Sequence, residues 1–257
     1  MARNSETVAA AIEAVNTIIS EQNAALKALK DTLSQKAAGG TGDTTQIDGI
    51  IDRSITEISN DRVTVIGDYA FYVCKSLITI DFPTATIVSS HAFHDCTSLT
   101  TVDFPAVTNI KSNAFRGCTG LTTVNFPAVN QSLGSNAFDN CTSLTTVYFP
   151  ALPYIGGYSF ANCTSLTTAE FPVANNISAG TFYGCTSLNT LILRETDNVC
   201  NLKNTNAFTS TPIESGNGYI YVPSALVDSY KAATNWSVFA DQIRAIEDYP
   251  EITGGAA

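Results

Sequence analysis

The sequence is poor in basic residues, and this shortage excludes several classes of protein. Its 257 residues include 13 Lys and Arg against 23 Asp and Glu, which gives a net charge of −10. A nucleic-acid-binding protein needs a basic footprint for the phosphate backbone, and an anionic membrane surface repels a chain of this sign. The sequence also lacks an apolar run of the about 18 residues that a membrane-spanning helix requires. We therefore expect no nucleic-acid partner and no membrane insertion.

Residues for metal, haem and catalytic chemistry are equally scarce, because the chain holds two His and one Met. One helical turn could bring the imidazoles of His91 and His94 together. However, these residues belong to a repeat that is described below. The neighbouring Phe93 and Cys96 occupy inward-facing positions of this repeat, and other copies have unrelated residues at the positions of the two His. No nucleophile-elbow, zinc-protease or phosphate-loop sequence occurs. We expect no metal, no cofactor and no enzymatic activity.

The first residues lack the pattern of a secretory signal. Met1 to Glu6 contain one Arg among polar residues, and no apolar stretch of about 7–15 residues follows. On this pattern we expect the chain to fold in the cytoplasm of the cell that makes it, where cysteines stay reduced.

What the sequence does contain is a repeat marked by cysteine. Six cysteines follow one another at intervals of 22, 22, 23, 22 and 22 residues, each with a Phe three residues before it and a Leu three residues after it. A fixed period of this size is typical of a solenoid, in which each unit buries its apolar face only against its neighbours. The six are Cys74, Cys96, Cys118, Cys141, Cys163 and Cys185.

Equivalent cysteines in such a stack lie about 4.8 Å apart, a separation that a disulfide permits. Their side chains point in parallel, however, and the expected compartment is reducing. We interpret the six as buried thiols that act as small hydrophobic residues, with disulfides or a metal as the alternatives. Cys200 stands outside the ladder and is the strongest candidate for a reactive thiol.

Each unit predicts one short strand and one helical turn. From Val102 to Pro105, apolar and polar residues alternate as in a half-buried strand, which Pro105 ends because it lacks a ladder donor. A short loop with one inward aliphatic residue follows, such as Ile110. The segment from Asn113 to Cys118 then closes about one helical turn. Stacked copies are expected to form a single parallel β-sheet with short helical turns on the other side.

The unit I-x-x-x-A-F-x-x-C-T-S-L-T-T-V-x-F-P resembles the BspA-like subclass of bacterial leucine-rich repeats, over about Val63 to Leu193. The sequence departs from the general leucine-rich repeat after the strand, where Val107 and Val129 replace the usual Asn or Cys. The resemblance implies an α/β repeat solenoid. It also implies a non-catalytic role in adhesion or interaction, with varied ligands.

The two ends of the repeat region differ from its centre, as expected for caps that close a solenoid. Beyond a last strand, Tyr219 to Pro223, Ser224 suits a helix N-cap, and apolar residues from Leu226 to Trp236 recur at helical spacing. This pattern predicts a helix that plugs the open end of the core. The domains expected are the solenoid with its N-terminal cap over 47–218, a strand-helix cap over 219–250 and a flexible tail over 251–257.

Residues 1–38 carry an unbroken heptad pattern, which is typical of a coiled coil. An isolated helix of this length is marginal in water, so its apolar stripe needs a partner. β-branched residues at both core positions favour three strands, and the Gly-rich linker over 39–46 separates the helix from the repeats. We expect a homotrimer, with docking of the helix on its own solenoid as the alternative. The expected seam residues are Val8, Ile12, Val15, Ile19, Gln22, Leu26, Leu29 and Leu33.

One outward strand column differs between copies that otherwise agree. It runs from Asp81 and Asp103 through Tyr148 to Ile192. Variable exposed residues on a rigid sheet suit ligand binding, with plain surface drift as the alternative. Tyr offers a large contact area at low entropy cost, although the tyrosines could instead shield the core edge. We expect a neutral or cationic ligand on the Tyr148 side. The candidate ligand-binding residues are Tyr148, Tyr154, Tyr158, Tyr183 and Glu170.

A solenoid on a trimeric stalk is the design of a surface-displayed binding protein. We expect a fibre or spike of a bacteriophage virion, made in the host cytoplasm, that attaches to a glycan or protein of the host surface and to other virion proteins. The alternatives are a BspA-like adhesin at the bacterial cell surface and a cytosolic interaction scaffold.

Overall fold

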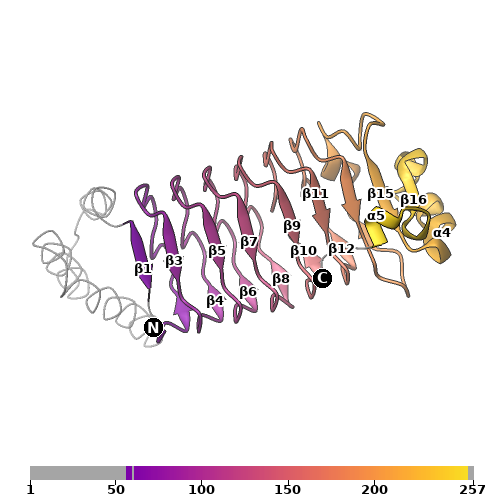
Figure 1. Cartoon of the computed structure of the whole chain (residues 1–257). Helices are drawn as coiled ribbons and strands as arrows, with labels where there is room; N and C mark the ends of the chain where they lie inside the picture. The colour runs from indigo at the N-terminus through magenta and orange to yellow at the C-terminus, as the bar shows by residue number, and fades with distance from the viewer. Residues whose placement is uncertain (1–55, 60, 254–257) are drawn as a thin grey trace, which may run out of the picture.

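The computed structural model describes residues 56–59 and 61–253, which form an elongated solenoid of stacked turns (Figure 1). The coiled coil predicted over 1–38 and the linker predicted over 39–46 lie outside the described residues. Each turn contains a strand of three residues, a strand of two residues and a tight turn. The predicted α/β repeat solenoid is confirmed.

The three-residue strands form one parallel row in which equivalent residues pair, as Val102 does with Val124. In most of them the central residue is buried and its two neighbours point outward. Hydrogen bonding divides the row into β1-β3, β5-β7 and β9-β11-β13, and β15 (Tyr219–Val222) and β16 (Ile243–Ala245) extend the last group. The repeat strands are β1 (Glu57–Ser59), β3 (Thr79–Asp81), β5 (Thr101–Asp103), β7 (Thr123–Asn125), β9 (Thr146–Tyr148), β11 (Thr168–Glu170) and β13 (Thr190–Ile192).

The segment expected to be a short loop in each repeat is a second strand. These strands form a seven-stranded parallel sheet in the order β14-β12-β10-β8-β6-β4-β2. In-register stacking places the N–H groups beside each inward aliphatic residue opposite C=O groups of the adjacent repeat. The two segments therefore pair by hydrogen bonds. The strands are β2 (Val65–Ile66), β4 (Ile87–Val88), β6 (Asn109–Ile110), β8 (Ser132–Leu133), β10 (Tyr154–Ile155), β12 (Asn176–Ile177) and β14 (Asn201–Leu202).

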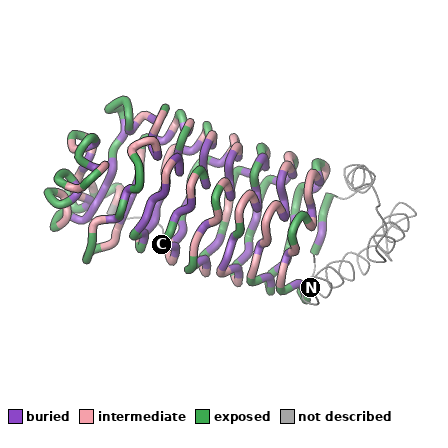
Figure 2. The backbone as a smooth tube through the Cα atoms, turned by 180° about the vertical axis from the view of Figure 1, so that it is seen from behind, coloured by how far each residue is buried: buried purple, intermediate pink, exposed green. Residues whose placement is uncertain are grey.

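Two stacks of phenylalanine fill the core along the solenoid axis. In the first stack the Phe115 ring lies 5.1 Å from both Phe93 and Phe138, nearly parallel to each. The second stack runs beside it, with Phe126 and Phe149 6.0 Å apart. Figure 2, seen from behind, shows buried residues in every turn. Each ring inside a stack is therefore sandwiched between its copies in the adjacent repeats.

The cysteines form a buried ladder beside the first stack, and none is paired with another. The Cys118 thiol donates to the carbonyl of Phe93 in the preceding repeat at 3.0 Å, and Cys141 donates to Phe115 in the same way at 3.2 Å. The interpretation of the six as buried thiols is confirmed. Cys supplies both a small apolar volume and a weak donor for a carbonyl that the turn leaves open.

Each turn between the strands holds two residues in the left-handed backbone conformation, one two residues before the core Phe and one two residues after it. In the fourth repeat these are Asn136, at φ 55°, and Asn140, at φ 61°. Asn, Asp and Gly tolerate this conformation, whereas bulky and β-branched residues rarely adopt it. Val73 is the β-branched exception, at φ 60°.

Replacing Val73 with Asn is expected to raise the free energy of unfolding by about 1 kcal/mol, because the left-handed conformation costs a β-branched residue about 1–2 kcal/mol. Urea denaturation of the full chain measures the change. The matched control is Val65→Asn in strand β2, where the same substitution removes a strand-favouring residue and should lower stability. A lower midpoint for Val73→Asn contradicts the prediction.

The C-terminal cap closes the phenylalanine stack with aromatic rings. Trp236 lies 6.0 Å from Phe208, the last ring of the stack, and Phe239 lies 5.1 Å from it. The Trp236 indole donates to the Cys200 carbonyl at 2.6 Å, and the Tyr230 hydroxyl accepts from the Cys200 N–H at 2.9 Å. The cap therefore covers the last ring and pairs the backbone at the open end. No helix among the described residues is long and apolar enough to cross a membrane.

The cap contains short turns and a six-residue helix in place of one regular helix. These are the 3-10 turns η2 (Ser224–Leu226) and η3 (Ser237–Gln242) and the helix α4 (Val227–Ala232), whereas the 3-10 turn η1 (Thr205–Phe208) precedes the cap and carries the last ring of the stack. The prediction of Ser224 as a helix N-cap is wrong, because Ser224 begins η2 and its N–H donates to Glu247 Oε2 at 2.9 Å.

Candidate binding surface

The outward side chains of the three-residue strands form two columns along the solenoid. The first is almost entirely Thr, and the second changes from repeat to repeat. In the second column the Ser59 hydroxyl donates to Asp81 at 3.4 Å, and the Asn125 amide donates to Asp103 at 2.9 Å. The last exposed residue of this column is Tyr148, whose surface is 42% exposed. No other segment of the described residues covers the strand face from β1 to β9.

The C-terminal segment covers the remainder of this face. The Glu170 carboxylate is buried and lies 2.5 Å from Arg194 Nε, and Arg194 Nη2 donates to the carbonyl of Ile252 at 2.7 Å. The prediction of Glu170 as an exposed ligand contact is wrong, because this segment lies over β11 and β13. The segment comprises η4 (Ile246–Asp248) and α5 (Pro250–Thr253).

An apolar cluster holds that segment in place. Its members are Ile192, Tyr221, Ile246, Tyr249 and Ile252. The predicted flexible tail is wrong for residues 251–253, because they belong to α5 and Ile252 packs on the sheet. The last residues of that prediction, 254–257, lie outside the described part of the chain.

The four predicted tyrosines are all exposed but do not lie on one face. Tyr148 lies on the three-residue strands and Tyr154 on β10 of the second sheet, where its hydroxyl meets that of Ser178 at 3.1 Å. Tyr158 and Tyr183 lie in the turns, with their rings 6.4 Å apart. The structure thus brings Tyr158 and Tyr183 together and separates both from Tyr148.

Sequence reasoning missed a second aromatic group in the turns of the first two repeats. Tyr69 is 55% exposed, stacks on His91 at 4.6 Å and meets the edge of Tyr72 at 5.5 Å. Tyr69 occupies the same repeat position as Tyr158, two residues before the core Phe. That shared repeat position is the sequence signal that identifies Tyr69 as a second exposed tyrosine of the same kind.

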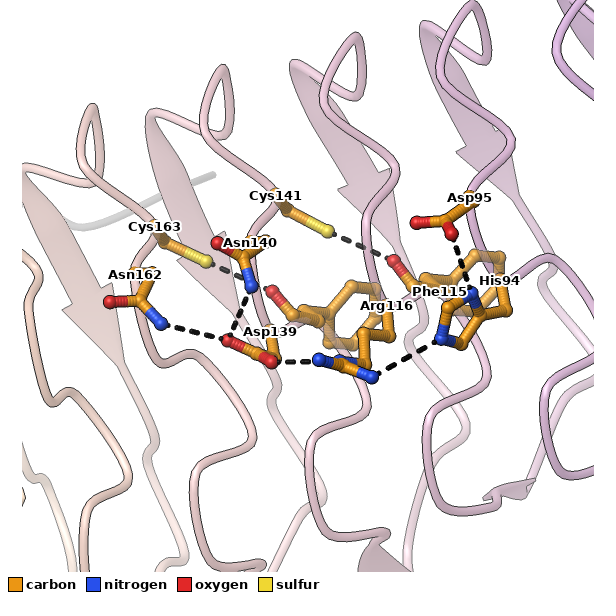
Figure 3. A network of polar contacts seen from close by, with 10 residues as sticks. His94, Asp95, Phe115, Arg116, Asp139, Asn140, Cys141, Asn162 and Cys163 are labelled. Carbon is orange, nitrogen blue, oxygen red and sulfur yellow. Dashed lines mark hydrogen bonds and ion pairs between the residues drawn. The ribbon is translucent and has the colours of Figure 1, made fainter. Parts of the chain in front are cut away.

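A polar network links the turns across four repeats (Figure 3). Arg116 Nη1 lies 3.4 Å from His94 Nε2, and Arg116 Nε donates to a carboxylate oxygen of the buried Asp139 at 2.9 Å. The Asn162 amide donates to the other oxygen of this carboxylate at 3.0 Å. Burial lowers the pKa of His94, and Arg116 and His91 lower it further against the opposing effect of Asp95. The described residues contain no group of three potential metal ligands. The network is built to join repeats.

Burial makes Cys118, Cys163 and Cys200 poor nucleophiles. Burial raises the pKa of Cys118 and of Cys163 well above the ordinary value for a thiol. Burial also raises the pKa of Cys200 to about 12. The prediction of Cys200 as a reactive thiol is wrong, because the C-terminal cap encloses it and a thiol reacts as its thiolate.

Stacked turns of a parallel strand, a second strand and a tight turn, with Leu and Phe columns inside, define a leucine-rich repeat solenoid. The chain belongs to the BspA-type leucine-rich repeat family. The family model described as "BspA type Leucine rich repeat region (6 copies)" matches residues 52–167 and 108–221. No curated protein matches the chain.

Solved structures of bacterial proteins share this fold. A leucine-rich repeat protein of T. pallidum, TpLRR, is 26% identical, with a TM-score of 0.56 over 68% of this chain and 81% of its own. A leucine-rich repeat protein of Eubacterium ventriosum is 23% identical, with a TM-score of 0.54 over 62% of this chain. This chain covers 43% of the E. ventriosum protein. The second likeness therefore concerns less than half of that protein and shows the fold alone.

Proposed function

We propose that this chain is a non-catalytic binding protein that attaches to a host-cell surface as a fibre or spike of a bacteriophage virion. The observation that carries the proposal is the strand face from β1 to β9, which no other described segment covers. Its inward positions are all Ile or Val, whereas its exposed column changes from Asp81 to Tyr148. Solenoids use such faces to bind partners. Assembly with other virion proteins completes the proposal.

Attachment of the full chain to host cells tests this function. Tyr148→Ala is expected to weaken attachment at least about tenfold, because an exposed Tyr at the end of a polar column is the anchor that the strand face offers. Asp103→Ala, a matched change in the same column, should attach nearly as well as the parent. Unchanged attachment by Tyr148→Ala together with loss in Asp103→Ala contradicts the assignment of the anchor.

A bacterial surface adhesin is the second candidate function, and the family favours it, because the solved relatives are bacterial proteins. The genes around the coding sequence separate the two candidates. Capsid, portal or tail genes on either side support the virion, and a surface-protein locus supports the adhesin.

Self-association through residues 1–38 is part of the proposal. Light scattering of the full chain should give the mass of a trimer. Ile19→Asp places a charge in the heptad seam and should reduce the mass to that of a monomer. Thr17→Asp places the same charge at an outward heptad position and should leave the trimer intact. A monomeric parent contradicts this part of the proposal.

A further inference from the structure

One column of the turn layer carries aromatic side chains at positions that disfavour them. It consists of the left-handed residues two before each core Phe, of which Tyr69 is at φ 57° and Tyr158 at φ 55°. Asn113, Asn136 and Gly180 occupy the same position in other repeats and tolerate this conformation. A bulky residue there costs backbone energy that Asn would avoid. Residues retained at such a cost point to a function.

Neighbouring residues orient both rings but leave them open to solvent. Tyr69 stacks on His91, with ring planes 7° apart. Tyr158 lies over Gly180, where an added Cβ would meet the Tyr158 ring at 2.3 Å. Gly at 180 therefore makes room for the Tyr158 ring. The two rings stay 55% and 43% exposed, so neither is used to fill the core.

Amide groups lie between the two rings. Asn113 and Asn136 stand in the same column, and their side chains make no hydrogen bond within the described part of the chain. Tyr69 and Tyr158 are four repeats apart, and with about 4.8 Å per repeat their separation is about 19 Å. The column thus places an aromatic ring at each end of a line of amide groups that have no hydrogen-bond partner among the described residues. We call Tyr69, His91, Asn113, Asn136 and Tyr158 the turn column.

We propose that the turn column binds an extended neutral polysaccharide. The C–H faces of two sugar rings would pack on Tyr69 and Tyr158, and hydroxyl groups between them would hydrogen-bond to Asn113 and Asn136. The inference rests on the proposed binding function and adds a second face and a ligand class to it. The turn layer lies on the other side of the core from the three-residue strands that carry Tyr148 (Figures 1 and 2).

The arrangement favours a linear polymer over a protein. A protein interface needs a continuous patch of about 800 Å² on each partner with an apolar centre. Here the apolar groups are two separate rings, and polar amides occupy the centre. The turn column contains no Lys, Arg, Asp or Glu, and the chain carries a net charge of −10, which disfavours an anionic polymer.

Affinity electrophoresis of the full chain tests the proposal, in gels that contain mixed-linkage β-glucan, xylan, galactomannan or dextran, with polygalacturonate as the anionic comparison. At least one neutral polymer should retard the parent. Tyr69→Asn and Tyr158→Asn should each weaken retardation about tenfold, the contribution of one aromatic contact, and the double variant should abolish it. Tyr219→Asn, the same change at an exposed tyrosine of β15 outside both proposed binding faces, should bind as the parent does.

A thermal unfolding measurement on the same variants separates binding from packing. Tyr69→Asn and Tyr158→Asn should keep the parent's unfolding midpoint or raise it by about 2–4 °C, because Asn relieves the backbone cost. Lower midpoints for both would show that the rings serve packing and would overturn the proposal. No retardation by any neutral polymer, or retardation by polygalacturonate alone, would also overturn it.

The tests distinguish this inference from the proposed function. Loss of polysaccharide binding in Tyr148→Asn with normal binding in both turn variants would place the site on the strand face and overturn the turn column alone. Polysaccharide retardation of the parent that is lost in both turn variants, without attachment of the parent to host cells, would overturn the proposed function and leave the turn column intact.

Discussion

Replacing Phe115 with Ala is expected to lower the free energy of unfolding by about 3–5 kcal/mol, the cost of removing a buried aromatic ring and leaving a cavity. Phe115 is fully buried and contacts three rings, two from its own stack and Phe126 of the second stack at 5.7 Å. Collapse around the gap is limited, because strand pairing on both sides fixes the spacing of the repeats.

The effect should spread along the molecule, since the stability of a solenoid is close to a sum of repeat and nearest-neighbour terms. A weak central repeat uncouples the two halves, so the urea transition should broaden and its slope should fall. Thr123→Ala on the exposed face of the same repeat should change stability by less than about 0.5 kcal/mol. A midpoint equal to the parent's for Phe115→Ala would show that the repeat register is wrong.

The interior of the solenoid could be predicted from the sequence because each repeat must satisfy the same neighbours. Phe, Cys and Leu recur at fixed offsets, and all three columns are buried in the structure. Six copies of one requirement leave little ambiguity about which residues face inward. The same logic predicted the parallel strands, since in-register stacking pairs Val102 with Val124 and every equivalent residue likewise.

The two-residue strands escaped prediction because their signal is a single inward aliphatic residue such as Ile110. A strand of two residues has no alternation to detect, and it exists only because a copy lies beside it. The turn geometry, by contrast, could have been predicted from the sequence. Two columns rich in Asn and Gly flank each Phe, and residues of these types mark left-handed backbone.

The C-terminal end could not be predicted because it does not repeat. From the sequence, Glu170 is expected to be an exposed member of the variable strand column. It is buried because residues 246–253 fold over the sheet. Cys200 reads as a thiol outside the ladder, and only the positions of Tyr230 and Trp236 enclose it. Both errors fall where contacts connect segments far apart in the chain and no second copy exists for comparison.

The same end yields the second large expected effect. Replacing Trp236 with Ala is expected to cost about 3–5 kcal/mol in the stability of the last repeats. Trp236 is buried against Phe208 and Tyr230, and its indole N–H donates to the Cys200 carbonyl. Ala removes the ring that covers the end of the stack and leaves that carbonyl without its donor, and both losses destabilise the fold.

The damage should stay local, in contrast to that of Phe115→Ala, because a terminal unit has a neighbour on one side only. Hydrogen exchange should show faster exchange for the amides of β13 and β15 and unchanged exchange for those of β5 and β7. Trp236→Phe keeps a ring but removes the N–H, so it should lose less, about 1–2 kcal/mol. Equal loss of protection in every repeat of Trp236→Ala would show that the solenoid unfolds as a single unit and that the nearest-neighbour description fails for this chain.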